Sequence, residues 1–232
     1  MRQYPPQPML KNTLSLLAIV VLLCGCAGQS KSKSKTAAPE KEVGFTPLFN
    51  GQDLTGWTYG SKAGNGYQVR DGALYSTVAD GGNLFTEKEY ANFVLRFDFK
   101  LTPGANNGIA IRSPMEGQIA YKGTEIQVLD DSAEKYAKLR PEQYHGSIYD
   151  VVAAERGHLK PVGEWNSEEI TANGRHITVK LNGATIVDAN LDDVKDEAKL
   201  NKHPGLQRAS GHLGLLGHGA QVDFRNMRIK EL

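Results

Sequence analysis

From Phe45 onward the chain is built of short segments in which apolar and polar residues alternate, separated by Gly, Asn and Asp. Period-two alternation rich in β-branched and aromatic residues is typical of strands that bury one face. Asp71-Gly72 and Asn182-Gly183 each lie between two such segments. These pairs accept the positive φ that tight two-residue turns need, so both predict antiparallel hairpins.

Helices are predicted at only two places, Ser132 to Leu139 and Asp192 to Leu200, each ending shortly before a proline. Many strands and few helices indicate an all-β fold, a sandwich of two antiparallel sheets with one or two short helices. Residues 43–232 are enough for one sizeable core, so they are expected to form a single domain.

The N-terminal segment has the features of a signal peptide: Arg2 and Lys11 precede an apolar run from Leu14 to Leu23. The run has about half of the ~20 residues that a membrane-spanning helix needs. The motif that ends at Cys26 resembles a bacterial lipobox, which predicts a signal peptide over 1–26 and lipidation of Cys26. The alternative is an ordinary signal peptide with two incidental cysteines.

Residues 27–42 are small and polar, which predicts a flexible tether between the lipid and the domain. The expected location is therefore the cell envelope, on the periplasmic face or the outer surface, with the membrane reached through the lipid anchor only. No cysteine follows Cys26, which excludes a disulfide framework or a thiolate site in the domain.

Charge and residue spacing exclude further classes. Six of the 27 Lys and Arg residues precede Val43, which leaves the domain slightly acidic and without a long basic run. Binding to nucleic acid is therefore not expected. No His-x-x-x-His pair or carboxylate-rich loop is present, so the sequence predicts no cofactor and gives no indication of a divalent metal site.

Alternation also indicates which polar side chains share a face. In the segment 124–130, Glu125 and Gln127 should lie on a solvated face while Ile126 and Val128 point into the core. The same pattern in residues 108–112 places Arg112 on the face opposite the buried isoleucines. The alternative is a surface strand whose polar groups have no catalytic role.

Glu125, Gln127 and Asp130 occupy the positions of the Glu-x-Asp-x-x-Glu spacing found in lectin-type glucanases. The match is partial, because Gln127 cannot ionise as two-carboxylate catalysis requires. His218, between Gly217 and Gly219, suits proton transfer because imidazole titrates near neutrality. The alternative is a loop histidine with no role.

Several sequence blocks then occur in a recognisable order: FNGQDLTGW (49–57), NGI (107–109), EIQVLD (125–130), GSIY (146–149), GEWN (163–166) and DFRNMRIK (223–230). In these blocks the chain resembles the 3-keto-disaccharide hydrolase family. The resemblance implies a concanavalin A-like jelly roll, usually exported, that cleaves glycosides whose sugar is already a ketone at C3. It also implies dependence on a separate enzyme that oxidises the sugar at C3.

A C3 ketone acidifies the C2 proton, so a base can remove it, the C1 substituent leaves and water adds back. The catalytic candidates are Glu125 or His218 as the base, Arg112 for the enolate, and Asp130 or Tyr149 for the leaving group. Further candidates for substrate binding are Gln127, Arg225 and Lys160. The sequence departs from the family at Leu216 and Gly217, where relatives generally have Gln and Asp.

Two alternatives to an enzyme stay open at this stage. A non-catalytic, lectin-like carbohydrate-binding module would use exposed aromatic rings, for which Trp57, Tyr121, Tyr144 and Trp165 are candidates. Both tryptophans lie in hydrophobic blocks, however, and are expected in the core. A structural envelope domain would have no cluster of polar side chains.

Overall fold

The computed structural model describes residues 42–60, 66–77 and 82–232. The signal peptide, Cys26 and nearly all of the expected tether lie outside the described residues. Within them, no helix is long and apolar enough to span a membrane.

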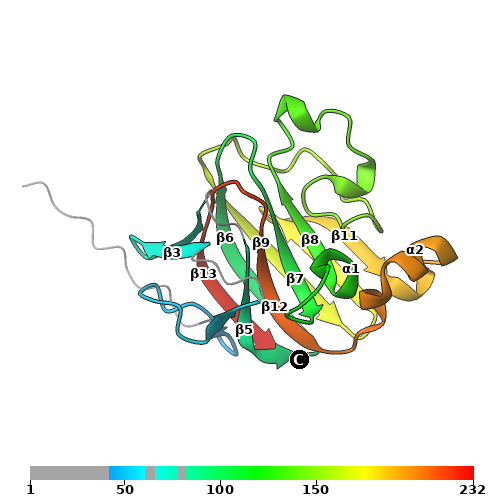
Figure 1. Cartoon of the computed structure of the whole chain (residues 1–232), viewed down its shortest axis with the longest axis horizontal. Helices are drawn as coiled ribbons and strands as arrows, with labels where there is room; N and C mark the ends of the chain where they lie inside the picture. The colour runs from blue at the N-terminus through cyan, green and yellow to red at the C-terminus, as the bar shows by residue number, and fades with distance from the viewer. Residues whose placement is uncertain (1–41, 61–65, 78–81) are drawn as a thin grey trace, which may run out of the picture. The chain divides into compact units, whose positions relative to one another are not determined.

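Two antiparallel sheets are stacked on one another (Figure 1). The larger sheet has eight strands in the described residues, and β1 pairs with β13 beside the main path. Its order is β11 (Ala184–Asn190), β10 (His176–Leu181), β9 (Trp165–Asn173), β6 (Phe93–Leu101), β13 (Val222–Glu231), β4 (Ala73–Ser76) and β3 (Tyr67–Arg70), with β1 at Thr46–Pro47.

The smaller sheet has five strands, in the order β2 (Trp57–Tyr59), β5 (Gly82–Tyr90), β12 (Gly211–Gly217), β7 (Asn106–Ser113) and β8 (Thr124–Leu129). The predicted all-β sandwich of two antiparallel sheets is therefore confirmed. Both predicted hairpin turns are present, with φ of 53° at Asp71 and 50° at Asn182.

The helical segments are short and lie outside the sheets. The expected helix over Ser132–Leu139 is reduced to one 3₁₀ turn, and the expected helix over Asp192–Leu200 is divided into a 3₁₀ turn and a two-turn helix that ends later. The segments are α1 (Ile119–Lys122), η1 (Glu134–Tyr136), η2 (Pro141–Gln143), η3 (Leu191–Asp193), α2 (Glu197–Lys202) and η4 (Pro204–Gln207).

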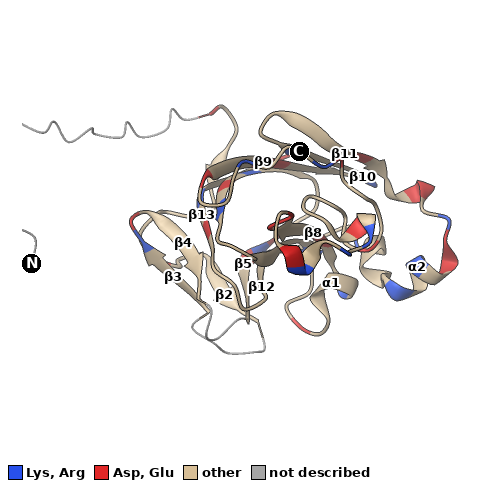
Figure 2. Cartoon of the chain, turned by 90° about the horizontal axis from the view of Figure 1, so that it is seen from above, with Lys and Arg blue, Asp and Glu red and all other residues tan. Residues whose placement is uncertain are grey.

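The core fills the space between the two sheets. Figure 2 shows the two sheets from above. Alternate residues of β6, among them Phe97 and Phe99, are buried there and meet Ile109 and Ile126 of the smaller sheet. Each such side chain contributes about 1.5–3 kcal/mol on burial. A second, smaller apolar cluster around Phe85 contains Ala110, Ile119 and Leu216, with Met115 packed against it.

Candidate active site

Strand β8 presents Glu125 and Gln127 on the outer face of the smaller sheet, while Ile126 and Val128 lie in the core between the sheets, as alternation predicts. The expectation that this face is solvated at β8 is wrong, because Glu125 and Gln127 are only 3% and 4% exposed. The segment after η2 hydrogen-bonds along the free edge of β8, with Gly146 N donating to Gln127 O and Tyr149 N donating to Glu125 O. Helix α1 also packs against β8. The polar side chains are therefore enclosed.

The carboxylate of Glu125 lies over Gly108, where any side chain would overlap Glu125 Oε1. This oxygen and Gln127 Oε1 are buried without a hydrogen-bond partner among the described residues. Buried polar atoms are nearly always paired, so two unpaired acceptors on neighbouring side chains indicate a site that receives another group.

His218 follows the last residue of β12 and lies beside Glu125. Its Nε2 is 3.7 Å from Glu125 Oε1, and its side chain is 48% exposed. This separation is too long for a hydrogen bond but close enough for electrostatic interaction. In unliganded sites such contacts often tighten only when substrate binds. The structure thus brings together Glu125 and His218, two of the five catalytic candidates.

A cavity of about 860 Å³ opens at His218, within the usual size range of small-molecule sites. Asn83 and Gly217 adjoin His218 in its lining. The lining also includes two groups of residues far apart in the sequence: Gln118, Tyr121 and Lys122 at α1, and Asn201, Lys202 and Pro204 at the end of α2 and just after it. The lining therefore combines His218, at the end of β12, with residues of α1 and α2 from distant parts of the sequence.

Tyr149 and Gln127 lie beside this pair without lining the cavity. The Tyr149 hydroxyl accepts a hydrogen bond from Gln143, whose carbonyl oxygen in turn accepts one from Gln127 Nε2. Leu216, in one of the two positions where the chain departs from the family pattern, is buried next to Phe85, and Gly217 leaves that part of the wall without a side chain.

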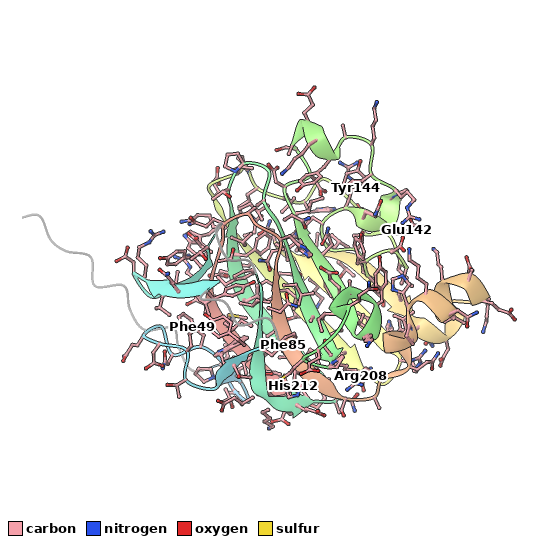
Figure 3. All side chains as sticks on the ribbon, in the orientation of Figure 1. Phe49, Phe85, Glu142, Tyr144, Arg208 and His212 are labelled. Carbon is pink, nitrogen blue, oxygen red and sulfur yellow. The ribbon has the colours of Figure 1, made fainter. Side chains whose placement is uncertain are left out.

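Arg112 does not share this cavity, which corrects the prediction that it faces the enolate. Its φ is 48° at a bulge in β7, and its guanidinium donates to Ala91 O, Asn92 Oδ1 and Gly174 O. The Arg112 carbonyl oxygen accepts from Arg208, labelled in Figure 3. Burial, followed by repulsion from Arg175, lowers the pKa of Arg112. Arg112, in the smaller sheet, therefore connects β7 to the turn between β5 and β6 and to the turn between β9 and β10 of the larger sheet.

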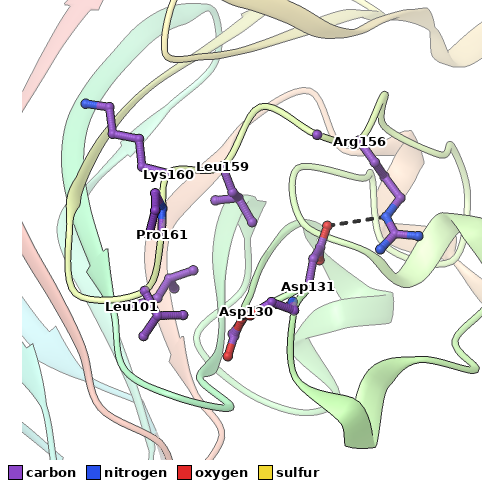
Figure 4. A pocket seen from close by; sticks show the side chains of 10 residues that line it. Leu101, Asp130, Asp131, Arg156, Leu159, Lys160 and Pro161 are labelled. Atoms are coloured by element: carbon purple, nitrogen blue, oxygen red, sulfur yellow. Dashed lines mark hydrogen bonds and ion pairs between the residues drawn. The ribbon is translucent and has the colours of Figure 1, made fainter.

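Asp130 is also absent from the cluster, because it lies beyond the end of β8. Its carboxylate accepts hydrogen bonds from Gly104 N and from the backbone and hydroxyl of Ser132. Burial alone would raise the pKa of Asp130, but these hydrogen bonds outweigh it and the pKa is lowered. Asp130 and Lys160 line a separate cavity of about 580 Å³, shown in Figure 4.

Arg225 and Lys160, predicted to bind substrate, are both held by Trp165. The Arg225 guanidinium lies 3.9 Å from the Trp165 ring centroid and pairs with Asp98, and Lys160 Nζ donates to Trp165 O. Trp165 pairs with Lys100 of β6 on the outer face of the larger sheet. These residues are therefore on the opposite side of the sandwich from Glu125.

The four aromatic candidates for sugar stacking also lie in different parts of the structure. Trp57 is buried in the core as expected, whereas Trp165 is only half-buried and lies outside it, so that expectation is wrong. Tyr144 is buried. Of the four candidates for sugar stacking, Tyr121 lines the cavity at His218.

Sequence reasoning missed Lys122, Lys202, Asn83 and Gln118 as cavity residues. Helix α1 has four residues, too few to produce a helical pattern, and nothing local indicates that it meets residues 201–204. The described residues contain no group of three or more His, Cys, Asp or Glu side chains that could hold a metal ion.

Comparison with known proteins gives a consistent result. The profile of the 3-keto-alpha-glucoside-1,2-lyase-like domain matches residues 44–230. The 3-keto-disaccharide hydrolase of Bacteroides thetaiotaomicron is 26% identical over 274 residues, covering 91% of this chain and 94% of the relative.

Solved structures agree with the fold. A Parabacteroides distasonis protein, described as a candidate glycosyl hydrolase, is 28% identical with a TM-score of 0.70, covering 82% of this chain and 94% of that chain. A Bacillus subtilis protein with a galectin-like fold has a TM-score of 0.55 at 12% identity, covering 82% and 95% of the two chains, and shows the fold alone. The predicted jelly-roll class is confirmed.

Proposed function

Because this chain belongs to the 3-keto-alpha-glucoside-1,2-lyase-like family of 3-keto-disaccharide hydrolases, we propose that it cleaves 3-keto glycosides in the cavity at His218. Family membership makes it a carbohydrate-active enzyme of the hydrolase and lyase class, as the sequence blocks predicted. The observation that carries the proposed site is the contact of His218, which lines the cavity, with the buried Oε1 of Glu125, which has no hydrogen-bond partner among the described residues.

The reaction we propose begins with removal of the proton at C2, which the neighbouring C3 ketone acidifies. The electron pair of the C2–H bond forms an enolate, then re-forms the ketone as the C1–O bond breaks, giving a C1=C2 double bond. The leaving oxygen takes up a proton. Water then adds across the double bond, so that the net reaction is hydrolysis.

His218 is the proposed base, because it lines the cavity and reaches solvent while Glu125 lies behind it. Glu125 would stabilise the imidazolium that forms and hold the ring in position. The enolate oxygen needs donors, which the side-chain amides of Asn83 and Gln118 supply in the cavity lining. Arg112 has no part in this step.

The test of function compares the domain, residues 43–232, on matched pairs of native and 3-keto glycosides while release of the leaving group is followed. We expect release from the 3-keto member only, because a native sugar lacks the ketone that acidifies C2. Equal release from both members, or from neither, contradicts the proposed chemistry. In the cell, such a substrate requires a separate reaction that oxidises the sugar at C3.

We further propose that the enzyme is anchored in the cell envelope by lipid on Cys26. Replacing Cys26 with Ser is expected to abolish lipidation and release the protein from the membrane fraction, since a thioether cannot form at a hydroxyl. Fractionation of cells is the measurement, with Cys24→Ser as the matched control that should remain bound. A Cys26→Ser protein that fractionates like the wild type would exclude this anchor.

A further inference from the structure

The part of the cavity lining that comes from α1 and α2 is positively charged. Lys122 and Lys202 belong to this part, and among the described residues the cavity lining contains no Asp or Glu. Glu125, the carboxylate in contact with His218, is not part of the lining. A neutral sugar does not explain why two ammonium groups line the cavity.

Lys202 belongs to a cluster in which positive charge exceeds negative charge. Its Nζ donates to Asp150 Oδ2 at 2.6 Å, and the same buried carboxylate pairs with Arg140 and with His203. Burial lowers the pKa of His203 despite its hydrogen bond to Asp150, so His203 is neutral at neutral pH. Two permanent cations therefore share one carboxylate.

Lys122 is exposed and has no carboxylate partner among the described residues, whereas Lys202 has one in Asp150. A Cβ built at Gly117, which also lines the cavity, would lie 2.7 Å from Lys122 Nζ. The amine therefore lies beside a cavity-lining residue, where an incoming anion can reach it.

The two lysines flank the ring of Tyr121. This ring meets His203 edge-on, with centroids 4.9 Å apart, and Lys202 Nζ is 5.3 Å from its centroid. Helix α1 is held against η4 by close backbone packing, because any side chain at Gly205 would overlap Gly123 O. The wall is therefore assembled before a ligand arrives, which lowers the entropic cost of binding.

Resting on the proposed function, we propose that Tyr121, Lys122 and Lys202 form a subsite for an anionic group on the leaving group of the 3-keto glycoside. The ring whose C2 proton is removed must lie at His218, so we assign the lining residues of α1 and α2 to the unit on the other side of the broken bond. Tyr121 offers an apolar ring for a sugar or aryl face, and the ammonium groups attract a carboxylate, sulfate or phosphate.

The experiment uses two aryl 3-keto glucosides that differ in one substituent, 4-carboxyphenyl and 4-carbamoylphenyl. The ratio of their kcat/KM values is measured for the wild type, for Lys122→Met, and for Lys138→Met as a control that removes an exposed lysine outside the cavity. Comparing ratios between proteins cancels the different reactivity of the two phenols.

We expect Lys122→Met to reduce the preference for the acidic substrate by about fivefold, the upper range for a solvent-exposed ion pair, through KM. The ratio for Lys138→Met should equal that of the wild type, and added salt should reduce the wild-type preference. An unchanged ratio in Lys122→Met overturns the subsite. If the preference depends instead on a carboxylate at C6 of the keto sugar, the assignment of the subsite to the leaving group is overturned.

Binding of 4-hydroxybenzoate, measured by calorimetry, separates this inference from the proposed function. If neither glucoside is cleaved but the acid binds the wild type more tightly than Lys122→Met, the proposed function fails and the anion subsite stands. If both glucosides are cleaved and the acid binds both proteins equally, the function stands and the subsite fails.

Discussion

Replacing Glu125 with Gln, or His218 with Asn, is expected to lower cleavage of a 3-keto glycoside about a hundredfold or more, the usual loss when a positioned general base is removed. Glu125→Gln keeps the shape of a side chain enclosed over Gly108 and deletes its charge. The imidazolium formed at His218 would then lack its counter-ion, which lies 3.7 Å away. The two replacements should therefore act on the same chemical step.

Two measurements on each variant identify that step: release of the leaving group, and exchange of the C2 hydrogen with deuterated solvent. Both rates should fall together, because deprotonation precedes elimination. His176→Asn is the matched control, since His176 pairs with Asp188 on the larger sheet, away from the cavity. If Glu125→Gln and His218→Asn both exchange and cleave at wild-type rates, the proposed site is wrong.

A double replacement tests whether the two residues act as a unit. Groups that work through one another are strongly non-additive. We therefore expect the variant carrying both changes to be little slower than His218→Asn alone. Losses that multiply would indicate two independent roles, with Glu125 contacting the substrate directly.

Replacing Arg112 with Met is expected to destabilise the domain by about 2–4 kcal/mol and to leave the chemistry of the folded protein unchanged. The guanidinium is buried and donates to Ala91 O, Asn92 Oδ1 and Gly174 O. These acceptors lie in the turn that joins β5 to β6 and in the turn that joins β9 to β10. Met fills much of the volume but leaves all three acceptors without this donor.

Urea unfolding gives the loss of stability, and turnover measured where the variant is fully folded gives the chemistry. Arg112→Lys should lose less stability than Arg112→Met, because it keeps the positive charge. It should still lose some, because Lys lacks the forked guanidinium that reaches three acceptors. Arg70→Met, which removes an exposed arginine stacked on Tyr75, should change stability by less than about 0.5 kcal/mol. A slow chemical step in fully folded Arg112→Met would instead support the role at the enolate that the sequence suggested.

Local pattern was sufficient for much of this molecule. Period-two alternation correctly predicts the strands and assigns Ile126 to the core and Glu125 to the other face, because side chains of a strand must point to opposite sides. Asp71-Gly72 and Asn182-Gly183 predict their turns because few residue pairs accept positive φ. Blocks spread over the whole domain were enough to recognise the family.

Local pattern was misleading where the backbone leaves regular geometry. Alternation placed Arg112 beside the polar face, but the bulge and its positive φ turn the side chain toward the ends of the sheets. Asp130 follows Glu125 at a catalytic spacing, yet β8 ends at Leu129 and the carboxylate serves the turn. Neither change can be read from residue types alone.

The enclosure of the site was decided by the tertiary structure. Glu125 is buried because residues 146–149 extend the edge of β8. His218, which contacts it, follows a strand that lies nearly a hundred positions later in the chain. The cavity wall joins α1 to residues 201–204, which no local pattern connects. A strand's sequence determines which way its side chains point, since that depends on neighbouring bonds. What covers those side chains depends on packing between distant segments. Only this packing encloses the polar side chains of β8 and forms the candidate site.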